Sequence, residues 1–275
     1  MINRIDFAKI DLEVRTTIQN SFDLLLKNSL KDFILFLADG EYIDSFKNLT
    51  TKLSPYVIDY RIDKYRDESR LLFLTKFLTE HYNFPTSQIQ NDDDEYRMQM
   101  ELMIYCHTWE SKPFLKKIYR LAHLVNGEKY EWDVKVPNMS KHEFIRFNIK
   151  EILKSNNNNI SEIIKKGYHS SLRNAFAHSE FSFDKINNHN RINLYNYSGN
   201  NWELQTISFD DWTKRFVYSV LFSFHLLKLT YNYRNLIIEK TGKSIFEIEH
   251  PNSLGELNIV KIEYKKEQDS FIFVR

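Results

Sequence analysis

The segment at residues 172–181, LRNAFAHSEF, brings together residue types that can cut a phosphodiester. A histidine with an ordinary pKa of about 6.5 can take a proton from a ribose 2′-hydroxyl or give one to the departing 5′-oxygen. Arginine offers a forked pair of donors to the phosphate oxygens as charge builds on them. Arg173 and His178 supply these groups. Such a route needs no metal and no cofactor, and it leaves a 2′,3′-cyclic phosphate and a 5′-hydroxyl.

The spacing of these residues predicts how a helix would present them. Asn174 and His178 are four positions apart, so they share a helix face, where the asparagine amide could fix the tautomer of the imidazole. Arg173 lies roughly 140° around the helix from His178. Its side chain must therefore reach around the helix or meet the histidine of a second copy. One histidine cannot easily be acid and base at once, so a symmetric dimer that pairs two copies of the motif is expected.

The pattern Arg-polar-x-x-x-His, followed by a small residue and then by an aromatic residue at the head of a strand, resembles the signature helix of HEPN domains. The resemblance covers the motif and about residues 96–240. It implies an all-helical bundle and a metal-independent endoribonuclease of the kind found in toxins and antiviral defence systems. It also implies that Arg173, Asn174 and His178 are the functional residues and that the chain forms a homodimer through the motif helix. RNA, such as tRNA or another structured RNA, would be the substrate, and an antitoxin or regulatory partner is a further expectation.

Four residues upstream of the motif are candidates for RNA binding. Lys165 and Lys166 could extend the cleft with charge, while Tyr168 and His169 could offer a stacking surface to an unpaired base. The alternative is that the lysines form the solvated face of a helix.

The motif also admits other interpretations. Arg173 could cap a bundle surface while His178 is an ordinary residue near a helix end. The chain could also be a non-catalytic HEPN-like module for dimerisation or nucleotide binding, in which case both side chains should turn into the bundle and pair with local groups. A third possibility is an enzyme that an antitoxin or the N-terminal region keeps silent.

Composition favours a helical globular protein. The chain has 275 residues, of which 42% are hydrophobic, with only 5 prolines and 6 glycines. A net charge of +1 gives no global attraction for a polyanion, so RNA contact must come from a local patch. The single cysteine, Cys106, excludes an internal disulfide, and the charged N-terminus does not suit a signal peptide, so a cytoplasmic location is expected. The apolar stretch 216–231 is shorter than the ~20 residues of a membrane span and predicts a buried helix.

The sequence contains no complete motif for a metal site or a phosphate-binding loop. Cys106, His107 and His123 have no fourth metal ligand at a suitable spacing, and the acidic run 92–95 lacks the glycine and spaced oxygens of a calcium loop. The glycines form no phosphate-binding loop, so nucleotide hydrolysis by that route is excluded.

The fold prediction is mainly α: a HEPN-like helical bundle with short β-strands after the motif helix and a C-terminal β-hairpin. Apolar residues at helical spacing predict helices within 22–37, 71–78, 98–109 and 113–127, and a capping box at Ser140 and Glu143 predicts another. The motif helix should begin near residue 160, and a long helix should run from Ser208 to Lys240. Residues 130–136 should be extended and 86–95 should form a loop. Alternation at 181–183, 192–194 and 202–204 predicts two or three short strands, with turns near 187–190 and 198–201. The expected regions are an N-terminal helical region at 1–95, the bundle at 96–240 and a β-hairpin extension at 241–275.

Overall fold

The computed structural model describes residues 2–48, 54–82, 84, 94–185, 190–252 and 255–274, and these form a mainly helical protein with small antiparallel sheets. The α-helices are α1 (Arg4–Asn28), α2 (Leu30–Leu37), α3 (Arg61–His81), α4 (Asp94–Glu110), α5 (Lys112–Val125), α6 (Lys141–Glu143), α7 (Glu151–Ser155), α8 (Ile160–Gly167), α9 (Ser170–Ala177) and α10 (Phe209–Thr241). Shorter helical turns are η1 (Asp44–Asn48), the π-helix η2 (Phe144–Lys150) and η4 (Lys266–Gln268). The strands are β1 (Glu41–Tyr42), β2 (Tyr56–Val57), β3 (Phe181–Asp184), β4 (Arg191–Leu194), β5 (Thr206–Ser208), β6 (Ile245–Pro251), β7 (Leu257–Lys265) and β8 (Ser270–Phe273).

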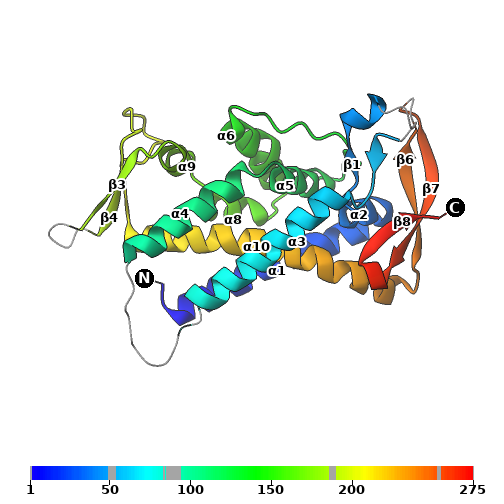
Figure 1. Cartoon of the computed structure of the whole chain (residues 1–275), viewed down its shortest axis with the longest axis horizontal. Helices are drawn as coiled ribbons and strands as arrows, with labels where there is room; N and C mark the ends of the chain where they lie inside the picture. Colours follow the sequence, from blue (N-terminus) through cyan, green and yellow to red (C-terminus); the bar gives the residue numbers. More distant parts are fainter. Residues whose placement is uncertain are drawn as a thin grey trace.

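The long helix α10 runs through the middle of the molecule, and α1, α3, α4 and α8 pack around it (Figure 1). Its start is fixed by Ser208, whose side chain accepts a hydrogen bond from the Asp211 backbone N–H at 3.1 Å. Its end is fixed by Gly242, which adopts a left-handed conformation with φ of 66°. The predicted helix from Ser208 to Lys240 is therefore confirmed, and the apolar stretch 216–231 lies largely in the core.

The apolar pattern at 22–37 is divided between two helices rather than one. Ser29 is extended, with φ of −155° and ψ of 107°, and its backbone N–H closes α1 by donating to the Leu25 carbonyl. The Ser29 side chain then accepts a hydrogen bond from the Asp32 backbone N–H at 3.3 Å and begins α2. The break persists because one serine caps both helices.

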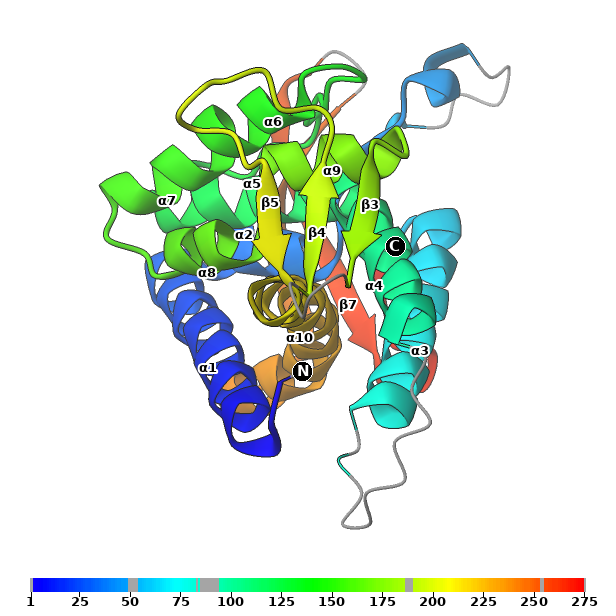
Figure 2. The same cartoon turned by 90° about the vertical axis from the view of Figure 1, so that its left-hand side faces the viewer.

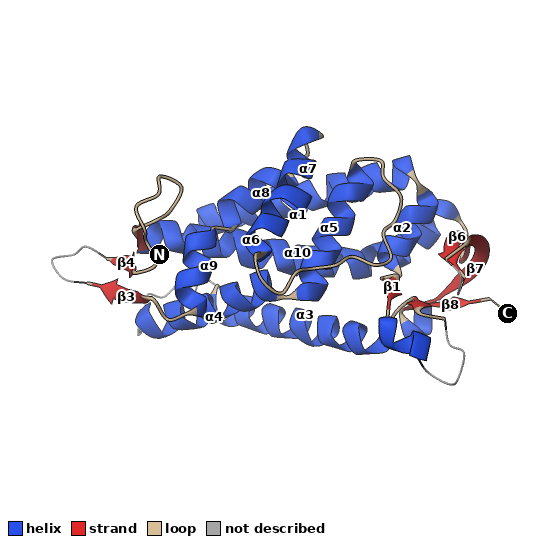
Figure 3. Ribbon diagram, turned by 90° about the horizontal axis from the view of Figure 1, so that it is seen from above, coloured by secondary structure: helices blue, strands red, loops and turns tan. Residues whose placement is uncertain are grey.

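Two three-stranded antiparallel sheets lie at opposite ends of the helical body (Figure 3). The sheet β3-β4-β5 follows the motif as predicted, and Figure 2 shows it across one end of α10. Its third strand lies at 206–208 instead of 202–204, because Trp202 is 62% exposed and the Leu204 N–H is bound to a serine side chain of α9. Most of the predicted turn at 187–190 lies outside the described residues, and 130–136 forms no strand.

The C-terminal sheet contains the predicted hairpin, β7 with β8, and a third strand that the prediction missed. Strand β6 pairs antiparallel with β7 along its whole length and packs against α2. In β6, the side chains of Phe246 and Ile248 are buried and that of Ile245 is 45% exposed, which is the alternation of a half-buried strand.

The hydrophobic core is continuous across the predicted regions. A single cluster of buried side chains includes Phe22 from α1, Trp109 from α4, Trp212 from α10 and Phe271 from β8. Residues 85–93, which hold most of the predicted loop at 86–95, lie outside the described residues. The division at 95 and 240 therefore stays a prediction. Among the helices that the structure describes, none combines the length and apolarity of a membrane span.

Candidate functional site

The motif occupies a short helix of its own. The single helix expected from about residue 160 to His178 is wrong, because α8 ends at Gly167 and α9 begins only at Ser170. At the break, His169 is extended and its Nδ1 accepts a hydrogen bond from the Ser171 backbone N–H at 3.2 Å, which caps α9. The His169 imidazole thus caps the start of α9 in the way that serine or asparagine side chains cap other helices.

The end of α8 is held against α10. A Cβ atom on Gly167 would lie 3.1 Å from the Ser219 backbone nitrogen, closer than ordinary van der Waals contact. Arg215 of α10 donates hydrogen bonds to the carbonyls of Lys165 and Tyr168, each at 3.1 Å. The last carbonyls of α8 are therefore satisfied by a cation, which suits the negative end of a helix dipole.

Helix α4 packs against the motif helix α9. The Tyr105 hydroxyl accepts a hydrogen bond from the His169 backbone N–H at 2.8 Å, and the Cys106 thiol lies 3.8 Å from the Arg173 carbonyl oxygen. Burial raises the pKa of Cys106 to about 11, so the thiol is neutral near pH 7. These contacts fix α9 at both its first and its middle turn.

Arg173 is paired with a carboxylate at the end of α4. Its Nη1 lies 2.9 Å from Glu110 Oε1, and its side chain is 14% exposed. The other oxygen of Glu110 accepts a hydrogen bond from Lys141 Nζ at 2.7 Å. Tyr168 lies beside the same guanidinium, and burial raises the pKa of its phenol while Arg173 acts in the opposite direction. The motif arginine is therefore half-buried in a small polar cluster formed by Arg173, Glu110, Lys141 and Tyr168.

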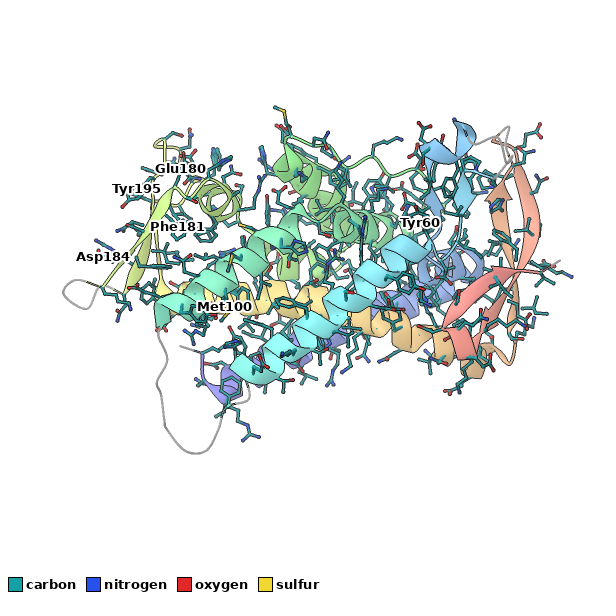
Figure 4. The ribbon with its side chains drawn as sticks, in the orientation of Figure 1. Tyr60, Met100, Glu180, Phe181, Asp184 and Tyr195 are labelled. Atoms are coloured by element: carbon teal, nitrogen blue, oxygen red, sulfur yellow. The ribbon has the colours of Figure 1, made fainter. Side chains whose placement is uncertain are left out.

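His178 lies at the other end of α9 and is exposed. Its backbone N–H donates to the Asn174 carbonyl at 3.1 Å, as expected for the residue that ends the helix. Within the described part of the chain, neither the His178 ring nor the Asn174 amide makes a side-chain hydrogen bond, so the expected contact between them does not form here. Beyond His178, Glu180, Phe181 and Tyr195 gather where β3 and β4 meet (Figure 4).

The two motif side chains do not share a site within one chain. Five residues of helix separate Arg173 and His178 by about 7.5 Å along the axis and by roughly 140° around it. Arg173 faces α4, whereas His178 lies on the surface where the chain turns into β3. An arrangement that uses both groups on one phosphate therefore requires a second copy or a movement of the arginine.

Both candidate RNA-binding lysines have partners in the described structure. Lys166 Nζ lies 2.5 Å from Glu13 Oε1 and 3.3 Å from the Tyr218 hydroxyl. Hydrogen bonds to these groups raise the Lys166 pKa against the effect of burial, which lowers it. Lys165 lies on the exposed face of α8, with Glu162 at 3.3 Å. Neither lysine is held toward the motif.

Tyr168 and His169 are half-buried at the break between α8 and α9. The Tyr168 ring packs on Trp109 with its centroid 4.8 Å away, so it is not a free stacking surface. Burial, with a smaller contribution from Arg215, lowers the pKa of His169 to about 4. His169 is therefore neutral at pH 7, and the RNA-binding role of the four residues stays a prediction.

Two further residues of the site could not be identified from the sequence. Glu110 and Lys141 lie 63 and 32 positions before Arg173, and no local pattern links them to the motif. Of the two alanines of α9, Ala175 is buried and Ala177 is exposed. Over the described ranges, no group of three or more His, Cys, Asp or Glu residues is placed to hold a metal ion.

Comparisons with protein-family models, with curated proteins and with solved structures find no match to this chain.

Proposed function

We propose that this chain is a metal-independent endoribonuclease of the HEPN type that acts as a homodimer, in the setting of a toxin or an antiviral-defence effector. The observation that carries the proposal is the arrangement on α9, where an exposed histidine without a side-chain hydrogen bond to the described residues follows an arginine that Glu110 holds in place. His178 is free to exchange a proton with a substrate. Arg173 already binds one anionic oxygen, which is the chemistry that a phosphate would require.

In the proposed dimer, each chain contributes Arg173 and His178 to one cleft on the twofold axis. One histidine removes the 2′-hydroxyl proton while the other protonates the 5′-oxygen that leaves. The 2′-oxygen then bonds to phosphorus, the bond from phosphorus to the 5′-oxygen breaks, and the arginines stabilise the charge on the non-bridging oxygens. The products are a 2′,3′-cyclic phosphate and a 5′-hydroxyl.

The experiment uses pure full-length protein with tRNA and total RNA in the presence of a chelator. Wild type is expected to cut RNA and to leave 5′-hydroxyl ends, which polynucleotide kinase labels without prior phosphatase treatment. Arg173→Ala and His178→Ala should each lose this activity, because each lacks a group used in the bond-breaking step. Lys76→Ala serves as the control, since it removes only an exposed ion pair with Glu80 on α3 and has no part in the proposed step. Cleavage that survives both motif substitutions would remove the mechanism.

A second candidate is a HEPN-like module without catalysis, serving dimerisation or nucleotide binding in a larger assembly. The pairing of Arg173 with Glu110 favours it, because the guanidinium is already neutralised inside its own chain. The exposure of His178 favours the nuclease instead. Wild type that forms a dimer yet cuts no RNA under any of these conditions would support the second candidate.

A further inference from the structure

A groove of about 520 Å³ opens beside the start of α9. One wall is the stretch from α6 through η2 to the start of α7, which contributes Arg146, Phe147 and Lys150. The facing wall is the break between α8 and α9, with His169, and the loop between β4 and β5, with Trp202. The groove therefore borders the same short helix that carries the motif. The wall of the groove formed by η2 is a π-helix, a kind of turn that occurs often at functional sites.

Two large aromatic side chains lie open in this groove. Phe147 is 54% exposed and Trp202 is 62% exposed. The loop that carries Trp202 is anchored to α9, because Ser171 Oγ accepts a hydrogen bond from the Leu204 N–H at 3.3 Å and the Ser171 carbonyl accepts one from Asn196 at 2.9 Å. Exposed aromatic rings offer flat faces to a planar ligand.

The cations of the groove differ from those nearer the motif. Lys166 and Arg173 are each paired with a carboxylate, whereas Arg146 and Lys150 have no carboxylate within salt-bridge distance in the described structure. The Arg146 guanidinium instead lies 5.0 Å from the centroid of the Phe147 ring. Proteins that bind unpaired bases stack them on aromatic rings or on guanidinium planes, and this groove offers both.

The groove also contains acceptors and a neutral donor. Glu143 and Glu151 line it, so its formal charges balance and charge alone will not hold a polyanion there. The two carboxylates can instead accept hydrogen bonds from the amino groups of a base. His169 uses Nδ1 as an acceptor toward Ser171, so its proton lies on Nε2 and offers a neutral donor. Stacking and hydrogen bonds to the base edge, more than phosphate contacts, would supply the affinity.

We propose that this groove binds an unpaired base of the RNA whose backbone is cut at Arg173 and His178. The inference rests on the proposed nuclease function, and it adds that the substrate is single-stranded on one side of the cut. Along α9, Ser170 at the groove lies about 12 Å from His178, a distance that an RNA strand spans within a few nucleotides. Duplex RNA cannot bring a base into this groove without unpairing it, so the groove selects loops and single strands.

The test measures binding without cleavage. Full-length protein carrying His178→Ala is titrated against a fluorescently labelled single-stranded RNA of twelve nucleotides, and the dissociation constant is read from anisotropy. The same RNA annealed to its complement is the second arm. Adding Trp202→Ala or Phe147→Ala should weaken single-strand binding about 5- to 150-fold, which corresponds to one lost base stack. The matched control is Phe73→Ala, an aromatic residue of α3 that is 52% exposed outside the groove and should leave binding unchanged.

Each result decides one of the two proposals. Unchanged binding by both groove variants, equal binding of duplex and single strand, or no measurable binding would overturn the groove assignment even if wild type cuts RNA. Selective binding that requires Phe147 and Trp202 would support the groove even if wild type cuts nothing, and the nuclease proposal alone would then fail. Circular dichroism melting of each variant shows that the fold is kept, which is expected because both side chains are largely exposed.

Discussion

Arg173 Nη1 lies 2.9 Å from Glu110 Oε1, so the motif arginine is bound by the last residue of α4. The same carboxylate accepts a hydrogen bond from Lys141 of α6. One glutamate thus connects three helices that are distant in the sequence, and it sets the direction in which the guanidinium points. An incoming phosphate would compete with Glu110 for Arg173.

Replacing Glu110 by glutamine should destabilise the protein. The change keeps the shape of the side chain but removes the charge that Arg173 and Lys141 share, at a site where the arginine is only 14% exposed. Loss of the charged hydrogen bond from Lys141, together with the ion pair to Arg173, should lower the free energy of unfolding by about 1–3 kcal/mol. Urea titration followed by circular dichroism measures the change. Glu162→Gln is the control, because its exposed contact with Lys165 should contribute less than ~1 kcal/mol. Equal midpoints for the two variants would show that Glu110 does not hold the cluster.

When His178→Ala protein replaces part of the wild type at fixed total concentration, RNA cleavage should fall more steeply than the wild-type fraction. If both histidines of a dimer act on one phosphate, a mixed dimer has only one of them and is inactive. Random exchange of subunits then makes activity follow the square of the wild-type fraction, so an equal mixture retains about a quarter of the activity. The assay is RNA cleavage after co-refolding at fixed total protein concentration. A linear dependence would mean that each chain works alone.

His169 should make the folded state sensitive to mild acid. Its pKa is about 4 in the folded protein because the ring is buried, whereas an unfolded histidine titrates near 6.5. Between these values the unfolded chain binds a proton that the folded chain does not, so stability falls as the pH drops through this window. His169→Asn keeps an acceptor for the cap of α9 but does not titrate. The free energy of unfolding of this variant should therefore decline less between pH 6.5 and 4 than that of wild type, and parallel curves would contradict the assignment.

Arg234 should be among the residues whose loss is most damaging to stability. Its side chain is 1% exposed, and it donates hydrogen bonds to Asp59 Oδ1 and to the carbonyls of Leu37 and Asp269, each at 2.9 Å. Arg234→Ala leaves the buried Asp59 carboxylate without its cation, which costs about 3–5 kcal/mol. Chemical denaturation measures the loss. Lys240→Ala, which breaks a partly exposed ion pair with Asp23, should cost less than ~1 kcal/mol. Similar losses for both variants would refute a structural role specific to Arg234.

Much of the fold could be predicted because hydrophobic periodicity and caps are local signals. The start of α10 followed from Ser208, and the first two strands after the motif followed from the alternation at 181–183 and 192–194. The capping box at Ser140 was wrong, because Ser140 adopts a left-handed φ of 55° and its side chain makes no cap hydrogen bond. The predicted helix does begin directly after Ser140, at Lys141, whose contact with Glu110 no short pattern encodes.

The sequence by itself determined which groups are available for chemistry: Arg173 and His178 are five residues apart, and that spacing alone places them on different sides of one helix. It also determined the helical class, through apolar spacing and the scarcity of proline and glycine. Only the tertiary structure decided that α8 and α9 are separate helices, that Glu110 neutralises the arginine and that His178 is exposed. The physical reason is that burial and ion pairing depend on residues brought together from distant parts of the chain, whereas helix periodicity depends on neighbours alone.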